Sequence, residues 1–162
     1  MGILDNDYKA AFDYMVLTWV LKVLKAKGLD NEVINIIKNL YENSLSIVVV
    51  NNVHGSCFVN NRWSIRQGDR PSSILFCYRL DPHLYWLDNR LKGIPIYKNN
   101  FFSVNNSTET YKFVAYVDDV KPSITSMAEF SLVDKGSSLF ESASGCVLHR
   151  DPALGKVNLL PL

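Results

Sequence analysis

Apolar positions near the start of the chain repeat with the period of an α-helix. This pattern predicts a helix from about Ala10 to Lys27 that Gly28 ends. Asp30 has the residue type of a helix N-cap, so a second helix is expected directly after it. The buried face of that second helix is predicted to contain Val33, Ile34, Ile37 and Tyr41.

After the second predicted helix, the sequence becomes rich in β-branched residues, which favour strands. Residues 46–50 read as a strand, residues 51–55 as a turn, and residues 57–65 as a second strand, which together predict a hairpin. A loop over residues 66–71 then precedes a helix from about Ser72 to Leu91. Pro82 is expected to kink or split this helix, and Gly93 to end it.

The second half of the chain alternates short strands with one helix. Strands are expected at residues 94–97, 101–104 and 111–116, with the last interrupted or turned at residues 117–120. A helix over residues 127–142, interrupted by Gly136, precedes extended segments at 146–149 and 156–160. Helices interleaved with hairpins favour an α+β fold with a mostly antiparallel sheet, in one domain spanning residues 1–162.

Composition supports a folded core and excludes some classes of protein. The chain has 162 residues, of which 48% are apolar and 20% charged, with a net charge of +1. No run approaches the roughly 18 apolar residues of a membrane span, so no membrane partner is expected. The first nine residues carry two acids and lack the basic region of a signal peptide. Three cysteines without metal-ligand spacing suit reduced thiols in an intracellular protein.

Positive charge is concentrated in the middle of the chain. Residues 61–100 contain seven basic and three acidic side chains, a local net charge of +4. Two interpretations remain open at this point. The segment is either an ordinary solvated surface or the place where a polyanion binds.

Three short polar motifs lie far apart in the sequence. They read DYKAAFD at residues 7–13, RQGDRPSS at 66–73 and AYVDD at 115–119. Two adjacent carboxylates after an apolar strand repel each other, and a divalent cation such as Mg²⁺ is the usual partner that relieves this repulsion. Acids are also common in turns, so the Asp-Asp pair alone leaves a purely structural role open.

In this order, the motifs resemble those of reverse transcriptases of the non-LTR (LINE-like) retrotransposon type. DYKAAFD is similar to motif A, RQGDRPSS to motif B and AYVDD to motif C, while Ser144-Gly145 with Lys156 looks like motif D. The resemblance implies a right-hand polymerase palm, with an antiparallel sheet flanked by helices, plus part of the fingers. It also implies that the thumb and the remaining fingers belong to other parts of a longer polyprotein.

The resemblance assigns roles to individual residues. Asp7 and Asp118 would bind two Mg²⁺ ions, for which Mn²⁺ is a possible substitute, with Asp119 as an accessory ligand. The backbone carbonyl of Tyr8 would add an oxygen ligand, and Lys156 would donate a proton to the leaving pyrophosphate.

Further residues would contact the nucleotide and template. Phe12 lies where the family has its steric gate against a 2′-OH, although a core aromatic is the competing interpretation. Arg66, Gln67 and Gly68 would contact the incoming nucleotide and the template. Motif B departs from the family at Arg70-Pro71, and motif D is stretched by residues 149–155.

The implied activity is RNA-directed DNA synthesis, with an RNA template, a DNA primer and dNTPs as partners. Two alternatives stay open: an RNA-dependent RNA polymerase, which would have to admit a 2′-OH beside Phe12, and a non-catalytic remnant that binds nucleic acid through residues 61–100. We expect the isolated chain to leave apolar surface uncovered. We also expect it to show no primer extension by itself, because phosphate contacts from fingers and thumb supply most of the affinity for a duplex.

Overall fold

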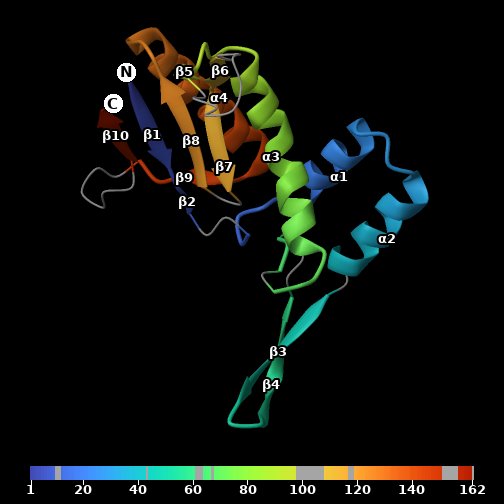
Figure 1. Cartoon of the computed structure of the whole chain (residues 1–162). Coiled ribbons are helices and arrows are strands. Elements are labelled where there is room, and N and C mark those ends of the chain that lie inside the picture. Colours follow the sequence, from blue (N-terminus) through green and yellow to red (C-terminus); the bar gives the residue numbers. More distant parts are fainter. Residues whose placement is uncertain are drawn as a thin grey trace, which may run out of the picture.

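The computed structural model describes residues 1–9, 12–42, 44–60, 64–66, 68–97, 108–116, 119–150 and 157–161 (Figure 1). The strands are β1 (Gly2–Asn6), β2 (Tyr8–Lys9), β3 (Leu45–Val50), β4 (Val53–Asn60), β5 (Ile94–Tyr97), β6 (Thr108–Tyr111), β7 (Phe113–Tyr116), β8 (Asp119–Ile124), β9 (Val147–Leu148) and β10 (Val157–Pro161). The helices are α1 (Leu17–Ala26), α2 (Asn31–Glu42), α3 (Ser72–Asp88) and α4 (Met127–Ser144). The predicted α+β class with antiparallel pairing is confirmed.

The largest sheet has four strands in the order β10-β1-β8-β7, and every neighbouring pair is antiparallel. Strand β1 is central, because it pairs with β10 on one side and with β8 on the other. Strands β7 and β8 form a hairpin that closes with the pair Tyr116↔Asp119. Three smaller two-stranded sheets join β2 to β9, β3 to β4 and β5 to β6.

Side chains alternate between the two faces of the four-stranded sheet. Leu4 and Asn6 on β1 are buried, whereas Ile3 and Asp5 between them are only half-buried. One face therefore packs against the helices, and α4 contacts β8 there. The other face of β1 and β8 is more open to solvent.

A single core joins the helix-facing side of the sheet to all four helices, with Tyr41 contributed by α2. It includes Leu4, Val20, Leu24, Phe76, Leu80, Val120, Val133 and Phe140. Gly136 does not interrupt α4, contrary to prediction. A Cβ atom there would lie 2.5 Å from the Trp86 ring, so the glycine lets α3 and α4 approach closely.

Helix α1 starts seven residues later than predicted. Residues 12–14 form a turn instead, and the amide of Val16 donates a hydrogen bond to the carbonyl of Ser144 at 3.1 Å. The segment before the helix is held as strand β2, which pairs Tyr8 with Leu148 of β9. These tertiary contacts override the local helical periodicity. The predicted end at Gly28 is confirmed, with φ at +86°.

Helix α2 begins as its N-cap predicted. The Oδ1 atom of Asp30 accepts a hydrogen bond from the amide of Glu32 at 2.7 Å. Tyr41 is fully buried, and Ile34 and Ile37 pack partly against the core. Val33 is 44% exposed, so its assignment to the buried face was wrong.

The hairpin β3–β4 extends away from the rest of the molecule (Figure 1). Its two-residue turn consists of Asn51 and Asn52, both with positive φ, as a tight hairpin turn requires. The predicted hairpin is confirmed, although β4 begins earlier and ends earlier than expected. Many of its apolar side chains are exposed, including Val50, Val53 and Phe58. Eight of the large apolar side chains that are exposed in the described part of the chain lie on this hairpin.

Helix α3 continues through Pro82, so the predicted split of this helix was wrong, and it ends at Asp88 rather than at about Leu91. Strand β8 contains Pro122 and was not anticipated. The pairing of β8 with β1 is recorded on either side of Pro122 but not at it, as expected for a residue without an N–H donor.

Among the described residues, none of the helices has both the length and the apolar composition needed to cross a bilayer.

Candidate functional site

The end of β1, the end of β7 and the start of β8 lie at the same edge of the main sheet (Figure 1). Asn6 pairs with Val120, and extending this antiparallel register by one residue brings Asp7 opposite Asp119. Both are half-buried. The alternation of faces puts them on the open side of the sheet, so two carboxylates from distant motifs point toward one surface.

A salt bridge lies next to this pair of acids on the same face. The ammonium group of Lys121 on β8 is 3.1 Å from Oδ1 of Asp5 on β1. The hydrogen bond and charge of Asp5, with a smaller contribution from Asp119, raise the pKa of Lys121. Asp5 therefore has a cationic partner on the neighbouring strand.

Tyr8 directs its side chain away from the open face. It is 2% exposed, and its ring meets Phe140 of α4 edge-on at a centroid distance of 5.7 Å. Burial raises the pKa of its hydroxyl, an effect that the nearby Arg79 guanidinium partly opposes. Only the backbone of Tyr8 is therefore available for the role that the motif implies.

Phe12 packs against the start of the helix that follows motif B. Its ring lies 4.7 Å from the Phe76 ring, measured between centroids, and the side chain is half-buried. Motif A is thus in contact with the first turns of α3, the helix that follows motif B. Phe12 packs against another aromatic ring and is only half-buried, so the two interpretations of this residue are compatible.

The loop before α3 is closed by hydrogen bonds. The hydroxyl of Ser72 donates to the carbonyl of Arg66 at 2.6 Å and lies 3.1 Å from the hydroxyl of Tyr41. The guanidinium of Arg66 forms a 2.9 Å ion pair with Asp69. Gly68 has φ at +95°, and a Cβ atom there would meet nothing within 4 Å. Its backbone is accessible to a ligand.

Three predicted site residues, Gln67, Asp118 and Lys156, lie outside the described residues. Two of them directly precede described strands: Asp119 starts β8, and Val157 starts β10 and pairs with Asn6. Within the described part of the chain, no three His, Cys, Asp or Glu side chains are grouped as metal ligands. Of the acidic residues proposed as metal ligands, only Asp7 and Asp119 therefore belong to the described part of the chain.

A buried polar cluster on the helix-facing side of the sheet was not predicted. Arg79 is fully buried on α3, with its guanidinium 4.0 Å from the Phe76 ring centroid and 5.6 Å from that of Phe140. It donates a hydrogen bond to the sulfur of Cys146. In the sequence, Arg79 stands among apolar positions of α3. That position alone does not show whether the arginine side chain is buried or exposed. Arg79 links α3 to the segment between α4 and β9.

No model of a known protein family matches this chain, and no curated protein sequence matches it. The resemblance therefore rests on the motifs themselves and on where the structure positions them.

Proposed function

We propose that the chain is the palm of a non-LTR reverse transcriptase, with part of the fingers, and that it takes part in RNA-directed DNA synthesis. The main support is the register between β1 and β8, which pairs Asn6 with Val120, the neighbours in sequence of Asp7 in one motif and Asp119 in another. Asp7 and Asp119 are 112 positions apart in the sequence. A double-aspartate hairpin beside a strand that ends in aspartate is the arrangement that the motifs imply.

The donor set suits Mg²⁺. Carboxylate oxygens are the ligands that this hard cation prefers, and it is usually held by one or two carboxylates together with substrate phosphates. Asp7 and Asp119, with Asp118 as the further expected ligand, would hold the ions. Bound Mg²⁺ would neutralise phosphate charge and activate the primer 3′-OH during nucleotidyl transfer.

The surrounding residues would orient the nucleotide. The open backbone at Gly68 permits close approach of a nucleotide or template. Phe12 would place its ring beside the sugar and exclude a 2′-OH. Arg66 would contact phosphate only by exchanging its ion pair with Asp69.

The metal site can be tested on the chain itself with Mn²⁺ as a paramagnetic probe. In amide NMR spectra, Mn²⁺ should broaden the signals of Asn6, Tyr8, Asp119 and Val120 first, and EDTA should restore them. Mg²⁺ in excess should compete. Equal broadening around an exposed helical acid such as Asp134, or none at the end of β1, would contradict the assignment.

Phe12→Ala should weaken the selection against ribonucleotides in a complete polymerase that carries this segment. Removing the ring makes room for a 2′-OH, and steric selection by a single group is typically worth about 10–200-fold in rate. The measurement is the ratio of single-turnover rates for dNTP and rNTP on an RNA template. Phe12→Tyr retains the ring and should retain the selection. If Phe12→Ala leaves the ratio unchanged, Phe12 has only its packing role against Phe76.

A further inference from the structure

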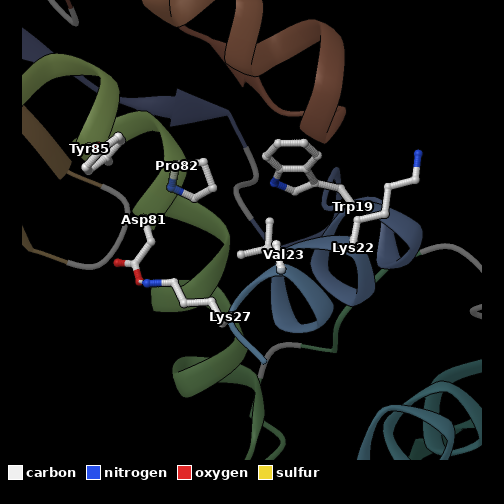
Figure 2. A pocket seen from close by; sticks show the side chains of 8 residues that line it. Trp19, Lys22, Val23, Lys27, Asp81, Pro82 and Tyr85 are labelled. Atoms are coloured by element: carbon white, nitrogen blue, oxygen red, sulfur yellow. Dashed lines mark hydrogen bonds and ion pairs between the residues drawn. The ribbon is translucent and has the colours of Figure 1, made fainter. Parts of the chain in front are cut away.

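The hollow between helices α1 and α3 has a volume of about 430 Å³ and is shown in Figure 2. Trp19, Val23 and Pro82 are among its walls. The side chains of Lys27 and Asp81 also line it and form an ion pair with each other. A ligand in this hollow would therefore meet mainly apolar surface, whereas an unpaired polar group lies beside the end of β1.

His149 lies directly across from Asp7 in the pairing of β2 with β9. Tyr8 pairs with Leu148, and the amide of His149 donates a hydrogen bond to the carbonyl of Asp7 at 2.9 Å. Residues directly opposite each other in an antiparallel pair have their side chains on the same face, with Cβ atoms about 4.5–5.5 Å apart. Tyr8 and Leu148 are both buried. Because side chains alternate along a strand, Asp7 and His149 point to the opposite, open side.

The imidazole of His149 has one nitrogen available to a ligand. The side chain is half-buried, and its Nδ1 atom is buried without a hydrogen-bond partner. Within the described part of the chain the ring forms no hydrogen bond, and only Nδ1 is shut off from solvent. A neutral imidazole has one N–H and one lone pair, so Nε2 can offer its lone pair to a cation while Nδ1 holds the proton.

An imidazole next to a carboxylate selects among divalent cations. Mg²⁺ takes oxygen ligands, whereas Zn²⁺ accepts imidazole nitrogen and carboxylate oxygen together, each at about 2.0–2.2 Å. One ion in contact with both groups needs a nitrogen and an oxygen about 3 Å apart, which side chains on directly opposite strand positions can reach. Two protein ligands leave the other positions of the ion to water or phosphate.

We propose that Asp7 and His149 form a binding site for Zn²⁺, with a carboxylate oxygen of Asp7 and Nε2 of His149 as its ligands. The site shares Asp7 with the proposed polymerase site, but its preference for Zn²⁺ rests on His149 and does not require polymerase activity. Zn²⁺ bound there would compete with Mg²⁺, because both ions need the same carboxylate.

Calorimetric titration with Zn²⁺ and with Mg²⁺ tests the site. The chain used carries Cys57→Ser and Cys77→Ser, because both thiols are exposed and would bind Zn²⁺ themselves. In this background Zn²⁺ should bind at least about tenfold more tightly than Mg²⁺. His149→Ala should weaken Zn²⁺ binding by about 10–100-fold or more, since losing a group that only orients a ligand already costs that much. Mg²⁺ binding should stay within about twofold, because this ion does not use the nitrogen.

His54→Ala is the matched control for His149→Ala. His54 lies on the exposed hairpin β3–β4, and its removal should change neither Zn²⁺ binding nor Mg²⁺ binding.

A second measurement needs no substitution at His149. In long-range ¹H–¹⁵N spectra of the histidine rings, Zn²⁺ should shift Nε2 of His149 and leave the ring of His54 unaffected, and Mg²⁺ should shift neither. The proposal is overturned if Zn²⁺ binds no more tightly than Mg²⁺, if His149→Ala leaves Zn²⁺ binding unchanged, or if the His149 nitrogens do not respond to Zn²⁺. The polymerase proposal would survive each of these results as long as Mn²⁺ broadens the amide signals at the end of β1.

Discussion

Asp7→Asn is expected to reduce nucleotide addition by about three orders of magnitude or more in a complete polymerase that carries this segment. The change keeps the shape of the side chain but removes the negative charge that would hold Mg²⁺. Losing several kcal/mol of electrostatic stabilisation in the transition state corresponds to a rate decrease of this size. Single-turnover kinetics with an RNA template and a DNA primer measure the effect directly.

Asp5→Asn is the matched control for Asp7→Asn. Both residues lie on the same face near the end of β1, but Asp5 pairs with Lys121 in a largely solvent-accessible salt bridge. Such a pair contributes little to stability, about 0–1 kcal/mol, and nucleotide addition should stay within a few-fold of the unmodified enzyme. If both variants lost the same amount of nucleotide addition, any change of charge on the open face would be harmful. That result would contradict a specific role of Asp7.

Gly145→Ala is expected to destabilise the fold by about 2–5 kcal/mol. Gly145 follows α4 with φ at +76°, a conformation that costs other residues about 1–2 kcal/mol. A Cβ atom there would also lie 2.4 Å from Cγ2 of Val16, and overpacking of this kind adds about 1–3 kcal/mol. Urea unfolding followed by circular dichroism gives the change in free energy.

Two further variants separate the cost of the backbone conformation at Gly145 from the cost of the steric clash with Val16. Gly28→Ala introduces a side chain at a similar positive φ of +86° but into open space, so it should incur only the conformational cost. Adding Val16→Ala to Gly145→Ala should recover part of the lost stability, because the clashing methyl group is gone. Equal effects of Gly28→Ala and Gly145→Ala would mean that contact with Val16 contributes nothing.

Elements whose signals are local were predictable from the sequence. The turn residues Asn51 and Asn52 and the N-cap Asp30 act through their own backbone neighbours, and the structure confirms both. The start of α1 was not predictable, because pairing between Tyr8 and Leu148 decides it across a long stretch of sequence. Gly136 was read as a break, whereas its small size serves the contact with Trp86.

In the candidate site, too, local signals were predictable from the sequence and long-range contacts were not. Motif residues identified Asp7 as the acid at the end of a strand, which is its position in the structure. Strand β8 was missed because Pro122 disfavours a strand locally. The ion pair between Lys121 and Asp5 was therefore not predicted either. The position of His149 beside Asp7 depends on the pairing between β2 and β9, which no local pattern reveals.

The central position of β1 has a consequence for folding during translation. Its two neighbours, β8 and β10, begin at residues 119 and 157, whereas β1 ends at residue 6. At roughly 5–20 residues per second, a ribosome needs about 6–22 s to add the 112 residues between the end of β1 and the start of β8. Over that interval the hairpin β3–β4 and the helix pair α1–α2 can form from nearby residues, while β1 has neither neighbour. Cotranslational folding should therefore begin in the helices and the hairpin, and the sheet should assemble last.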